Sequence, residues 1–208
     1  MDAIALLKAD HKMVETLFRR FERAGRNARK MKRRLVDQIV RELAVHAAIE
    51  EQVFYPTVRS KGGKLEEMIL LALEEHHVAK WTLKELEDLP PDAERFEAKV
   101  LVLMETIRNH IAEEEREIFP QVRKAFTPAE LKAMAQTLIV AKRAAPTRPH
   151  PRAPDTPPGN LVAGTMSAVL DMGKDAVQAL RRRRTPKAKT VQPQATSTAP
   201  GAETVLTH

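Results

Sequence analysis

Two segments of the sequence, 64 residues apart, carry nearly the same motif. Residues 46–56 read HAAIEEQVFYP, and residues 110–120 read HIAEEEREIFP. Each segment begins with a His, has a Glu four residues later, and ends on an aromatic residue followed by Pro. Four residues make about one turn of α-helix, so this His and this Glu lie on the same helical face. The sequence therefore predicts a duplicated helical unit that carries a His-x-x-x-Glu pair.

The duplication extends to the stretch before each motif. LLKADHKMVETLF (6–18) aligns loosely with LALEEHHVAKWTL (71–83), and the alignment matches His11 to His76. These two histidines are 65 residues apart, close to the 64 that separate His46 from His110. Each half is thus predicted to be a helical hairpin, with one His on its first helix and the His–Glu pair on its second.

The pattern of apolar residues predicts an all-α fold. Apolar residues recur at a spacing of three to four, without the alternation of strands. SKGGK at 60–64 and the two prolines at 90–91 break the pattern, Asp92 is a candidate N-cap, and TPAE at 127–130 is a capping box. The predicted helices span 3–25, 28–58, 65–89, 92–126 and 127–143. Four long helices with short connections favour an antiparallel up-down four-helix bundle built from two hairpin repeats, with a short fifth helix.

The composition changes after residue 143. Residues 144–208 contain nine Lys and Arg against four Asp and Glu, nine of the 14 prolines, and no aromatic residue. We therefore expect a folded helical domain over 1–143 and a mostly disordered, basic, Pro-rich tail over 144–208 that the fold does not need.

One part of this tail has an amphipathic pattern. An apolar stripe from Val162 to Leu180 is followed by four arginines, which is typical of a helix over 161–183 that docks on a protein or a membrane surface. A weakly helical, solvated segment explains the pattern equally simply, and we favour it. No aromatic residues alternate with the arginines, so specific nucleic-acid binding is not expected.

Several classes of protein are disfavoured by composition. The chain has no Cys, which excludes disulfides and thiolate metal sites. No apolar run of about 18 residues is present, and the first residues lack the layout of a signal peptide. The expected location is the cytoplasm.

Polar residues interrupt the apolar stripe of each of the four long helices. Carboxylates and imidazoles inside a bundle are costly unless they are paired, hydrogen-bonded or bound to a cation. A single His, or a single His–Glu pair, is more often an ordinary core or surface residue, but six such residues on four facing stripes favour a metal site. The candidate ligands are His11, His46, Glu50, His76, His110 and Glu114.

The chemistry of the ligands narrows the choice of metal. Six nitrogen and oxygen ligands are too many for a four-coordinate structural zinc site, and helical-bundle cores of this kind hold paired iron or manganese ions. Glu50 and Glu114 could bridge two ions while two histidines serve each one. That arrangement leaves room for a bridging oxo or hydroxo group and for an external ligand.

The two repeated motifs, with DH at 10–11 and EEHH at 74–77, resemble the hemerythrin-like (HHE cation-binding) proteins. The resemblance covers residues 1 to about 126 and implies that the six candidate residues are ligands of two non-haem iron ions. Members of the family bind O₂, sense oxygen, nitric oxide or iron, or handle peroxide.

The sequence departs from the oxygen-carrying hemerythrins at one position. Those carriers have a fifth His one turn from another on the third helix, and here the two possible positions hold Ala72 and Lys80. The difference argues against reversible O₂ carriage. His77 is expected on the surface beside Trp81 or behind the ligands, and Glu15 on a solvated edge, rather than in the metal site.

The residues next to the ligands carry further expectations. Asp10 and Glu75 precede the matched histidines and could each orient an imidazole of a neighbouring helix. The acidic residues that follow the ligand glutamates are expected to form a solvated acidic face: Glu51, Glu113, Glu115 and Glu117.

The ends of the two repeated motifs carry two more expectations. Pro56 and Pro120 should kink or end their helices, because proline removes a helical hydrogen bond. Phe54 and Phe119 should plug the end of the bundle.

Three functions follow from these patterns. The favoured one is a cytoplasmic di-iron protein that binds or senses O₂, nitric oxide or iron. The alternative is a di-iron enzyme that consumes peroxide or acts as an oxidase. A metal-free bundle that binds a protein partner through its basic tail is the third.

Overall fold

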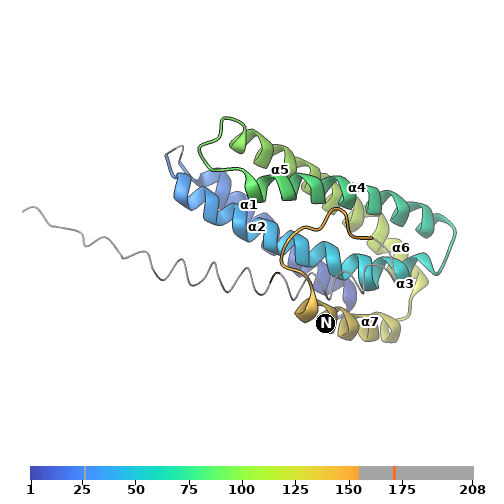
Figure 1. Ribbon diagram of the computed structural model, residues 1–208. Coiled ribbons are helices and arrows are strands. Elements are labelled where there is room, and N and C mark those ends of the chain that lie inside the picture. The colour runs from blue at the N-terminus through green and yellow to red at the C-terminus, as the bar shows by residue number, and fades with distance from the viewer. Residues whose placement is uncertain (26, 155–170, 172–208) are drawn as a thin grey trace, which may run out of the picture.

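The computed structural model describes residues 1–25, 27–154 and 171, and every regular element in that part of the chain is helical (Figure 1). The elements are α1 (Ala3–Arg23), α2 (Arg29–Ile49), η1 (Glu50–Phe54), α3 (Tyr55–Arg59), α4 (Lys64–Asp88), α5 (Phe96–Glu113), η2 (Glu114–Ile118), α6 (Phe119–Ala125) and α7 (Pro128–Ala144).

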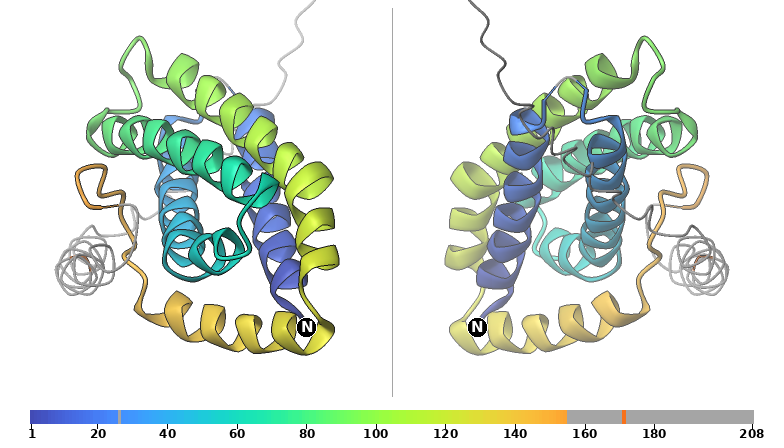
Figure 2. Two further views of the ribbon diagram at one scale, coloured as in Figure 1. Left: turned by 90° about the vertical axis from the view of Figure 1, so that its right-hand side faces the viewer. Right: turned by 90° about the vertical axis from the view of Figure 1, so that its left-hand side faces the viewer.

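These elements form four long helical rods. The rods are α1, then α2 continued through η1 and α3, then α4, then α5 continued through η2 and α6. Consecutive rods run in opposite directions, and the end-on views show the four around a common interior (Figure 2). Helix α7 lies outside the bundle, against α1, α2 and η1. The predicted all-α bundle with a fifth helix is confirmed.

The helix boundaries agree with the sequence pattern except before α5. That helix begins at Phe96 with Arg95 at its N-cap, so the prediction that Asp92 caps it was wrong. Two consecutive turns, closed by bonds from the Ala93 N–H to Pro90 O and from the Phe96 N–H to Ala93 O, delay the start of the helix. The capping box of α7 is confirmed, because Thr127 and Glu130 bond to each other's backbone N–H groups.

The two prolines of the repeated motifs do not end their helices. Each motif contains a π-helical segment, η1 or η2, that starts at the motif's Glu and stops two residues before its Pro. A proline has no N–H and its ring crowds the carbonyl four residues earlier, and a wider turn before it relieves both problems. The helix therefore continues past Pro56 and Pro120, and the expected break is replaced by an extra residue in the turn before each one.

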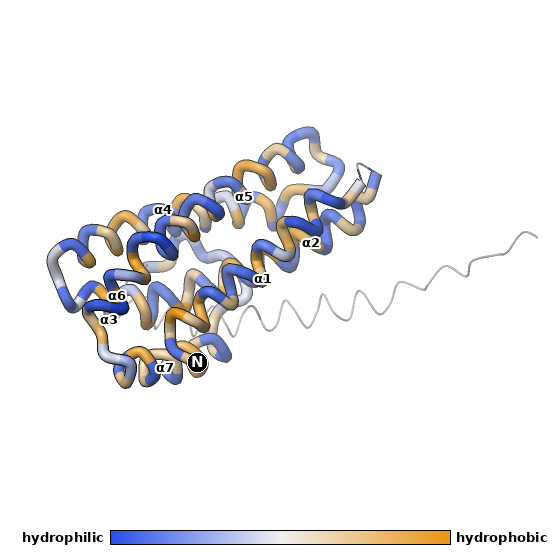
Figure 3. Tube along the Cα trace, turned by 180° about the vertical axis from the view of Figure 1, so that it is seen from behind, coloured by the Kyte–Doolittle hydropathy of each residue, from blue (hydrophilic) through white to orange (hydrophobic). Residues whose placement is uncertain are grey.

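The core consists of two apolar clusters, one toward each end of the bundle. Apolar positions recur along every rod (Figure 3). One cluster is built around Ile4, Leu7, Phe54 and Phe119, and the other around Phe18, Ile39, Leu86 and Phe96. Buried polar residues lie between the two.

The chain continues to pack against the bundle after α7. Ala145, Pro146, Pro149 and Pro151 are buried, and Arg148 Nη1 donates to Glu87 Oε1 at 2.7 Å. This part of the expected tail is thus held on the bundle, while the domain boundary at 143 stays a prediction.

The other predictions for the tail, including the helix over 161–183, lie outside the described residues except at Asp171. No helix in the described part of the chain is long and apolar enough to span a membrane.

Candidate metal centre

The six candidate ligands meet halfway along the bundle, between the two apolar clusters. All six are buried, with Glu50 and Glu114 fully inaccessible to solvent. Their side chains form two groups whose polar atoms lie within 4.8 Å of one another. The first group is His11, His46, Glu50 and Glu114, and the second is Glu50, His76 and His110. Glu50 belongs to both.

The short distances at the centre join Nε2 atoms and carboxylate oxygens. In the first group, His46 Nε2 lies 3.1 Å from Glu50 Oε2, and His11 Nε2 lies 3.2 Å from Glu114 Oε2. In the second group, the Nε2 atoms of His76 and His110 face each other at 3.1 Å. His76 Nε2 is also 3.5 Å from Glu50 Oε2, which links the two groups.

The other ring nitrogen of each imidazole points outward to a carboxylate. His110 Nδ1 lies 2.6 Å from Glu75 Oε2, and His46 Nδ1 faces Asp10 Oδ2 at 3.8 Å. The predicted orienting role of Asp10 and Glu75 is thus consistent with the geometry. Asp10 is held in turn by Lys142 of α7.

The Nδ1 atoms of the remaining two histidines contact the acidic residues that directly follow Glu50 and Glu114 in the sequence. His76 Nδ1 lies 3.0 Å from Glu51 Oε1, and His11 Nδ1 lies 2.9 Å from Glu115 Oε1. The prediction that Glu51 and Glu115 belong to a solvated acidic face was therefore wrong. Each side chain points between the helices toward the imidazole of a neighbouring rod, a contact that periodicity within one helix does not reveal. Glu113 and Glu117 are exposed, as expected.

These outward contacts decide which nitrogen carries the proton. An ionised carboxylate only accepts hydrogen bonds, so Nδ1 of His11, His76 and His110 donates and Nε2 of these rings faces the centre. His46 Nδ1 faces Asp10 at 3.8 Å without a hydrogen bond. Several of the central atoms have no hydrogen-bond partner although they are buried: His11 Nε2, His46 Nε2, both oxygens of Glu50, and Glu114 Oε2. Unpaired buried acceptors are costly, and a bound cation satisfies all of them at once.

Burial and mutual repulsion shape the charges of the two central carboxylates. Burial and the neighbouring Glu114 raise the pKa of Glu50 well above its usual value. Burial also disfavours the ionised form of Glu114, but the imidazoles of His110, His11 and His46 outweigh it and lower its pKa. Without a cation, the neighbouring Glu114 carboxylate therefore opposes the ionisation of Glu50.

The histidines respond to the same surroundings. Burial lowers the pKa of His46 to about 4 and also lowers the pKa of His76. Burial opposes the charged form of His110 too, but Glu114 and Glu75 raise its pKa. Neutral imidazoles are the form that binds metal ions, so His46 and His76 are in the ligating form at neutral pH.

Tyr55 also belongs to the centre, and the sequence analysis missed it. Its hydroxyl donates to Glu114 Oε1 at 2.9 Å and lies 3.1 Å from His76 Nε2. In an unbroken α-helix, Tyr55 would lie about half a turn from His46, nine residues earlier, and would face away from the centre. The π-helical segment η1 changes that rotation and places Tyr55 in the interior. The sequence feature that could have indicated a buried side chain at position 55 is the aromatic residue that precedes Pro in both motifs.

The equivalent position in the second motif is Phe119. Its ring stacks on His11, with centroids 5.8 Å apart and planes 7° from parallel, and it meets Phe54 edge-on. Phe119 is thus buried directly beside His11, and Phe54 is buried against Phe119 and Tyr55. The two halves of the centre differ in one hydroxyl group, which Tyr55 has and Phe119 lacks.

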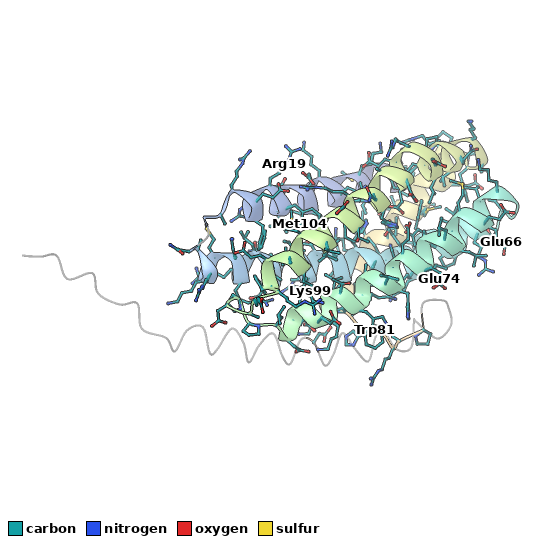
Figure 4. The ribbon with its side chains drawn as sticks, turned by 90° about the horizontal axis from the view of Figure 1, so that it is seen from above. Arg19, Glu66, Glu74, Trp81, Lys99 and Met104 are labelled. Atoms are coloured by element: carbon teal, nitrogen blue, oxygen red, sulfur yellow. The ribbon has the colours of Figure 1, made fainter. Side chains whose placement is uncertain are left out.

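The residues considered as extra ligands lie outside the two groups. His77 accepts a hydrogen bond from the indole N–H of Trp81, which lies on the outer side of α4 (Figure 4). Glu15 forms ion pairs with Arg19 and Arg108 at the surface. Lys80, at a possible position of the carriers' fifth His, bonds to Glu51 instead.

A small cavity adjoins the centre on the side of the second apolar cluster. Its volume is about 20 Å³, and all four histidines line it together with Lys80 and apolar residues of the four rods. A space of this size holds about one water molecule. A ligand larger than about one water molecule therefore fits only if side chains move.

The fold and the centre define a class of protein: a four-helix bundle whose buried His–Glu cluster is suited to metal cations. Residues 2–122 match the hemerythrin HHE cation binding domain. The chain belongs to this family.

Relatives support the assignment. A hemerythrin-like protein of Schizosaccharomyces pombe is 33% identical over 68% of this chain and 70% of its own length. A DNA nickase of a Nostoc species is 27% identical over 66% of this chain, but the match spans only 38% of that protein. The crystal structure of a hemerythrin HHE cation binding domain-containing protein from Mycobacterium kansasii has the same fold, with a TM-score of 0.60 and 24% identity over 69% of this chain and 86% of that one.

Proposed function

We propose that the protein is a non-haem di-iron protein that binds a small ligand at the His–Glu centre. The observation that carries the proposal is the membership of Glu50 in both groups of candidate ligands. A carboxylate shared by two groups is a bridge between two ion positions, and such pairs are a recurrent feature of helical-bundle metal sites.

The residues divide between the two positions. His11 and His46 would hold one ion, and His76 and His110 the other, with Glu50 and Glu114 between them. Imidazole and carboxylate ligands without sulfur suit iron, and manganese is the second choice. An iron pair would supply redox chemistry and sites for an added ligand. The protein supplies four imidazoles that face outward carboxylates, and it holds them in a buried interior.

The ligand is proposed to be O₂, nitric oxide or iron itself, bound for sensing rather than for transport. The cavity of about 20 Å³ beside the four histidines has room for a diatomic molecule only if side chains move slightly. Position 80 holds a lysine that bonds to Glu51, so the fifth imidazole of the oxygen carriers has no counterpart there.

Metal analysis of single variants tests the two-ion arrangement. We expect about two iron ions per chain in the wild type, about one in His76→Ala, and nearly none in Glu50→Ala, because Glu50 belongs to both groups of candidate ligands. His77→Ala is the matched control, since His77 is adjacent in sequence but faces Trp81, and it should keep the wild-type content. Circular dichroism checks that each variant is folded. Two ions retained in Glu50→Ala would refute the bridge.

A peroxide-consuming or oxidase-type enzyme is the second candidate, and Tyr55 is the observation that favours it. Its hydroxyl is a buried proton donor in contact with Glu114 and His76. Steady-state peroxide consumption by iron-loaded protein separates the two functions. Turnover that persists in the wild type and falls in Tyr55→Phe would favour the enzyme.

A further inference from the structure

Three of the outward carboxylates are each joined to a lysine: Asp10 to Lys142, Glu115 to Lys8 and Glu51 to Lys80. The lysines of the last two pairs, which occupy equivalent halves of the centre, differ in their surroundings. Glu115 accepts from His11 Nδ1 at 2.9 Å and pairs with Lys8 Nζ at 3.0 Å. Glu51 accepts from His76 Nδ1 at 3.0 Å and pairs with Lys80 Nζ at 3.1 Å. The carboxylates occupy equivalent positions of the duplicated hairpin. The two lysines do not occupy equivalent positions, because Lys8 lies about one turn before His11 whereas Lys80 lies about one turn after His76.

The two lysine–carboxylate pairs differ most in their contact with solvent. The side chains of Lys8 and Glu115 are 46% and 31% exposed, whereas those of Lys80 and Glu51 are 9% and 7% exposed. The chain after α7 accounts for part of this difference, because residues 146–154 share a pocket of about 40 Å³ with Lys80 and Glu51. That segment is anchored by the bond from Arg148 to Glu87.

Burial changes what such a pair does to the imidazole that it contacts. An exposed ion pair is screened by water and contributes little. A buried pair is screened much less, so the ammonium group of Lys80 acts strongly on the Glu51 carboxylate and through it on His76. Removing the ammonium would leave a buried carboxylate without its counter-charge, and the orientation of the imidazole that depends on it would change.

We propose that Lys80 is a positioning residue for the ion held by His76 and His110, and that it makes the two ion positions unequal. The proposal rests on the proposed function, since it needs two ion positions. Lys80 lines the small cavity beside the four histidines, but its ammonium group bonds to Glu51 and not to a candidate ligand. It fixes Glu51, Glu51 fixes the His76 ring through Nδ1, and the His11 side depends on an exposed pair instead.

Titration of the full-length, metal-free protein with Co²⁺, followed by calorimetry and visible absorption, tests the proposal. Lys80→Met should weaken one of the two Co²⁺ sites by about 10–100-fold, the usual effect of removing a partner behind a metal-bound imidazole. Lys8→Met is the matched control and should change either affinity by less than about fivefold. Lys80→Arg, which keeps the charge, should recover most of the lost affinity.

Paired variants assign the effect to one ion position. In His11→Ala, the site that remains is the one with His76 and His110, and adding Lys80→Met should weaken it. In His76→Ala the other site remains, and adding Lys80→Met should leave its affinity unchanged. Because Lys80→Met alone removes a cation from beside the buried Glu51 carboxylate, the double variant Glu51→Gln, Lys80→Met provides a folded alternative with the same expected loss.

The outcomes separate this inference from the proposed function. A wild-type protein that binds fewer than two Co²⁺ ions contradicts the two-ion arrangement itself. If the wild-type protein has two sites but Lys80→Met binds Co²⁺ with the same affinities as Lys8→Met, the two-ion arrangement stands. Only the proposed role of Lys80 is then overturned.

Discussion

Each imidazole of the centre uses its two nitrogens for different purposes. Nδ1 faces a carboxylate at the edge of the bundle, and Nε2 faces the middle, where acceptors outnumber donors. The only hydroxyl in contact with these groups in the described part of the chain is that of Tyr55. Its contribution can be measured because Phe119, at the equivalent position, shows that a phenyl ring fits this kind of site.

Replacing Tyr55 by Phe should leave the fold and both ions in place. The change removes a buried hydrogen bond to Glu114, so we expect the metal-free protein to lose about 1–3 kcal/mol of unfolding free energy. The visible spectrum of the iron-loaded protein should shift, because the donor to Glu114 is gone. Urea unfolding and absorption spectroscopy measure the two effects, with Phe54→Leu as a packing control that should leave the spectrum unchanged. An unaltered spectrum in Tyr55→Phe would mean that its hydroxyl does not influence the metal pair.

The elements place the residues by means of two local devices. The π-helical segments η1 and η2 follow the His of each motif and re-aim the side chains beyond the Glu, and they explain how each helix accommodates its proline. Helix caps fix where rods begin, and α1 has the best-defined cap of the four. Asp2 accepts from the Ala5 N–H at 2.8 Å and pairs with Arg123 of α6, so it ties the first rod to the last.

Asp2→Ala should destabilise the metal-free protein by about 1 kcal/mol at pH 7, the usual effect of losing an N-cap. The bond from Ala5, helped by Arg123, lowers the pKa of Asp2 in the folded state below its usual 3.8. A carboxylate with a lowered folded pKa stabilises the fold above the unfolded pKa and loses that contribution as the pH falls through the folded value. The difference between wild type and variant should therefore narrow below about pH 4.

Asp2→Asn serves as the control for this experiment. Asn keeps a capping oxygen without the charge, so Asp2→Asn should be intermediate in stability at pH 7. Neither variant has the Asp2 carboxyl, so the stability difference between Asp2→Asn and Asp2→Ala should vary little with pH, while the deficit of each against wild type narrows below about pH 4. Urea unfolding at a series of pH values measures all three proteins. A deficit of Asp2→Ala that grows on acidification would contradict the assigned role of the Asp2 carboxylate.

On the scale of the whole molecule, the centre divides one core into two. The apolar clusters on either side are separated by a layer of six buried polar side chains, and in the metal-free protein that layer contains unpaired acceptors. Buried polar groups without partners destabilise a fold, so the metal is expected to contribute to folding as well as to function.

Removing the metal should lower the melting temperature of the protein. Ions that bind only the folded state stabilise it by mass action, and a thousandfold excess over the dissociation constant corresponds to about 4 kcal/mol. Differential scanning calorimetry of iron-loaded and chelator-treated protein measures the shift, and re-addition of iron should restore it. The melting temperature of the variant Glu50→Ala should not change when iron is removed. If it falls as much as that of the wild type, the stabilising ions are bound elsewhere in the protein.

Much of this molecule follows from local patterns. The all-α bundle, the duplicated hairpin and the meeting of His11, His46, Glu50, His76, His110 and Glu114 were predictable, because helical period and repeat spacing place residues on a face before any partner is known. The orientation of Asp10 and Glu75 followed from the same repeat.

Only the tertiary structure decided the surroundings of these six residues. Glu51 and Glu115 face imidazoles across the bundle, η1 turns Tyr55 inward, and residues 146–154 cover Lys80. Each of these features depends on segments far apart in the sequence, and a periodicity within one helix carries no information about which neighbour it will meet. The candidate ligands were therefore a property of the sequence, whereas the partners that orient them, and the inequality of the two halves, arise from packing.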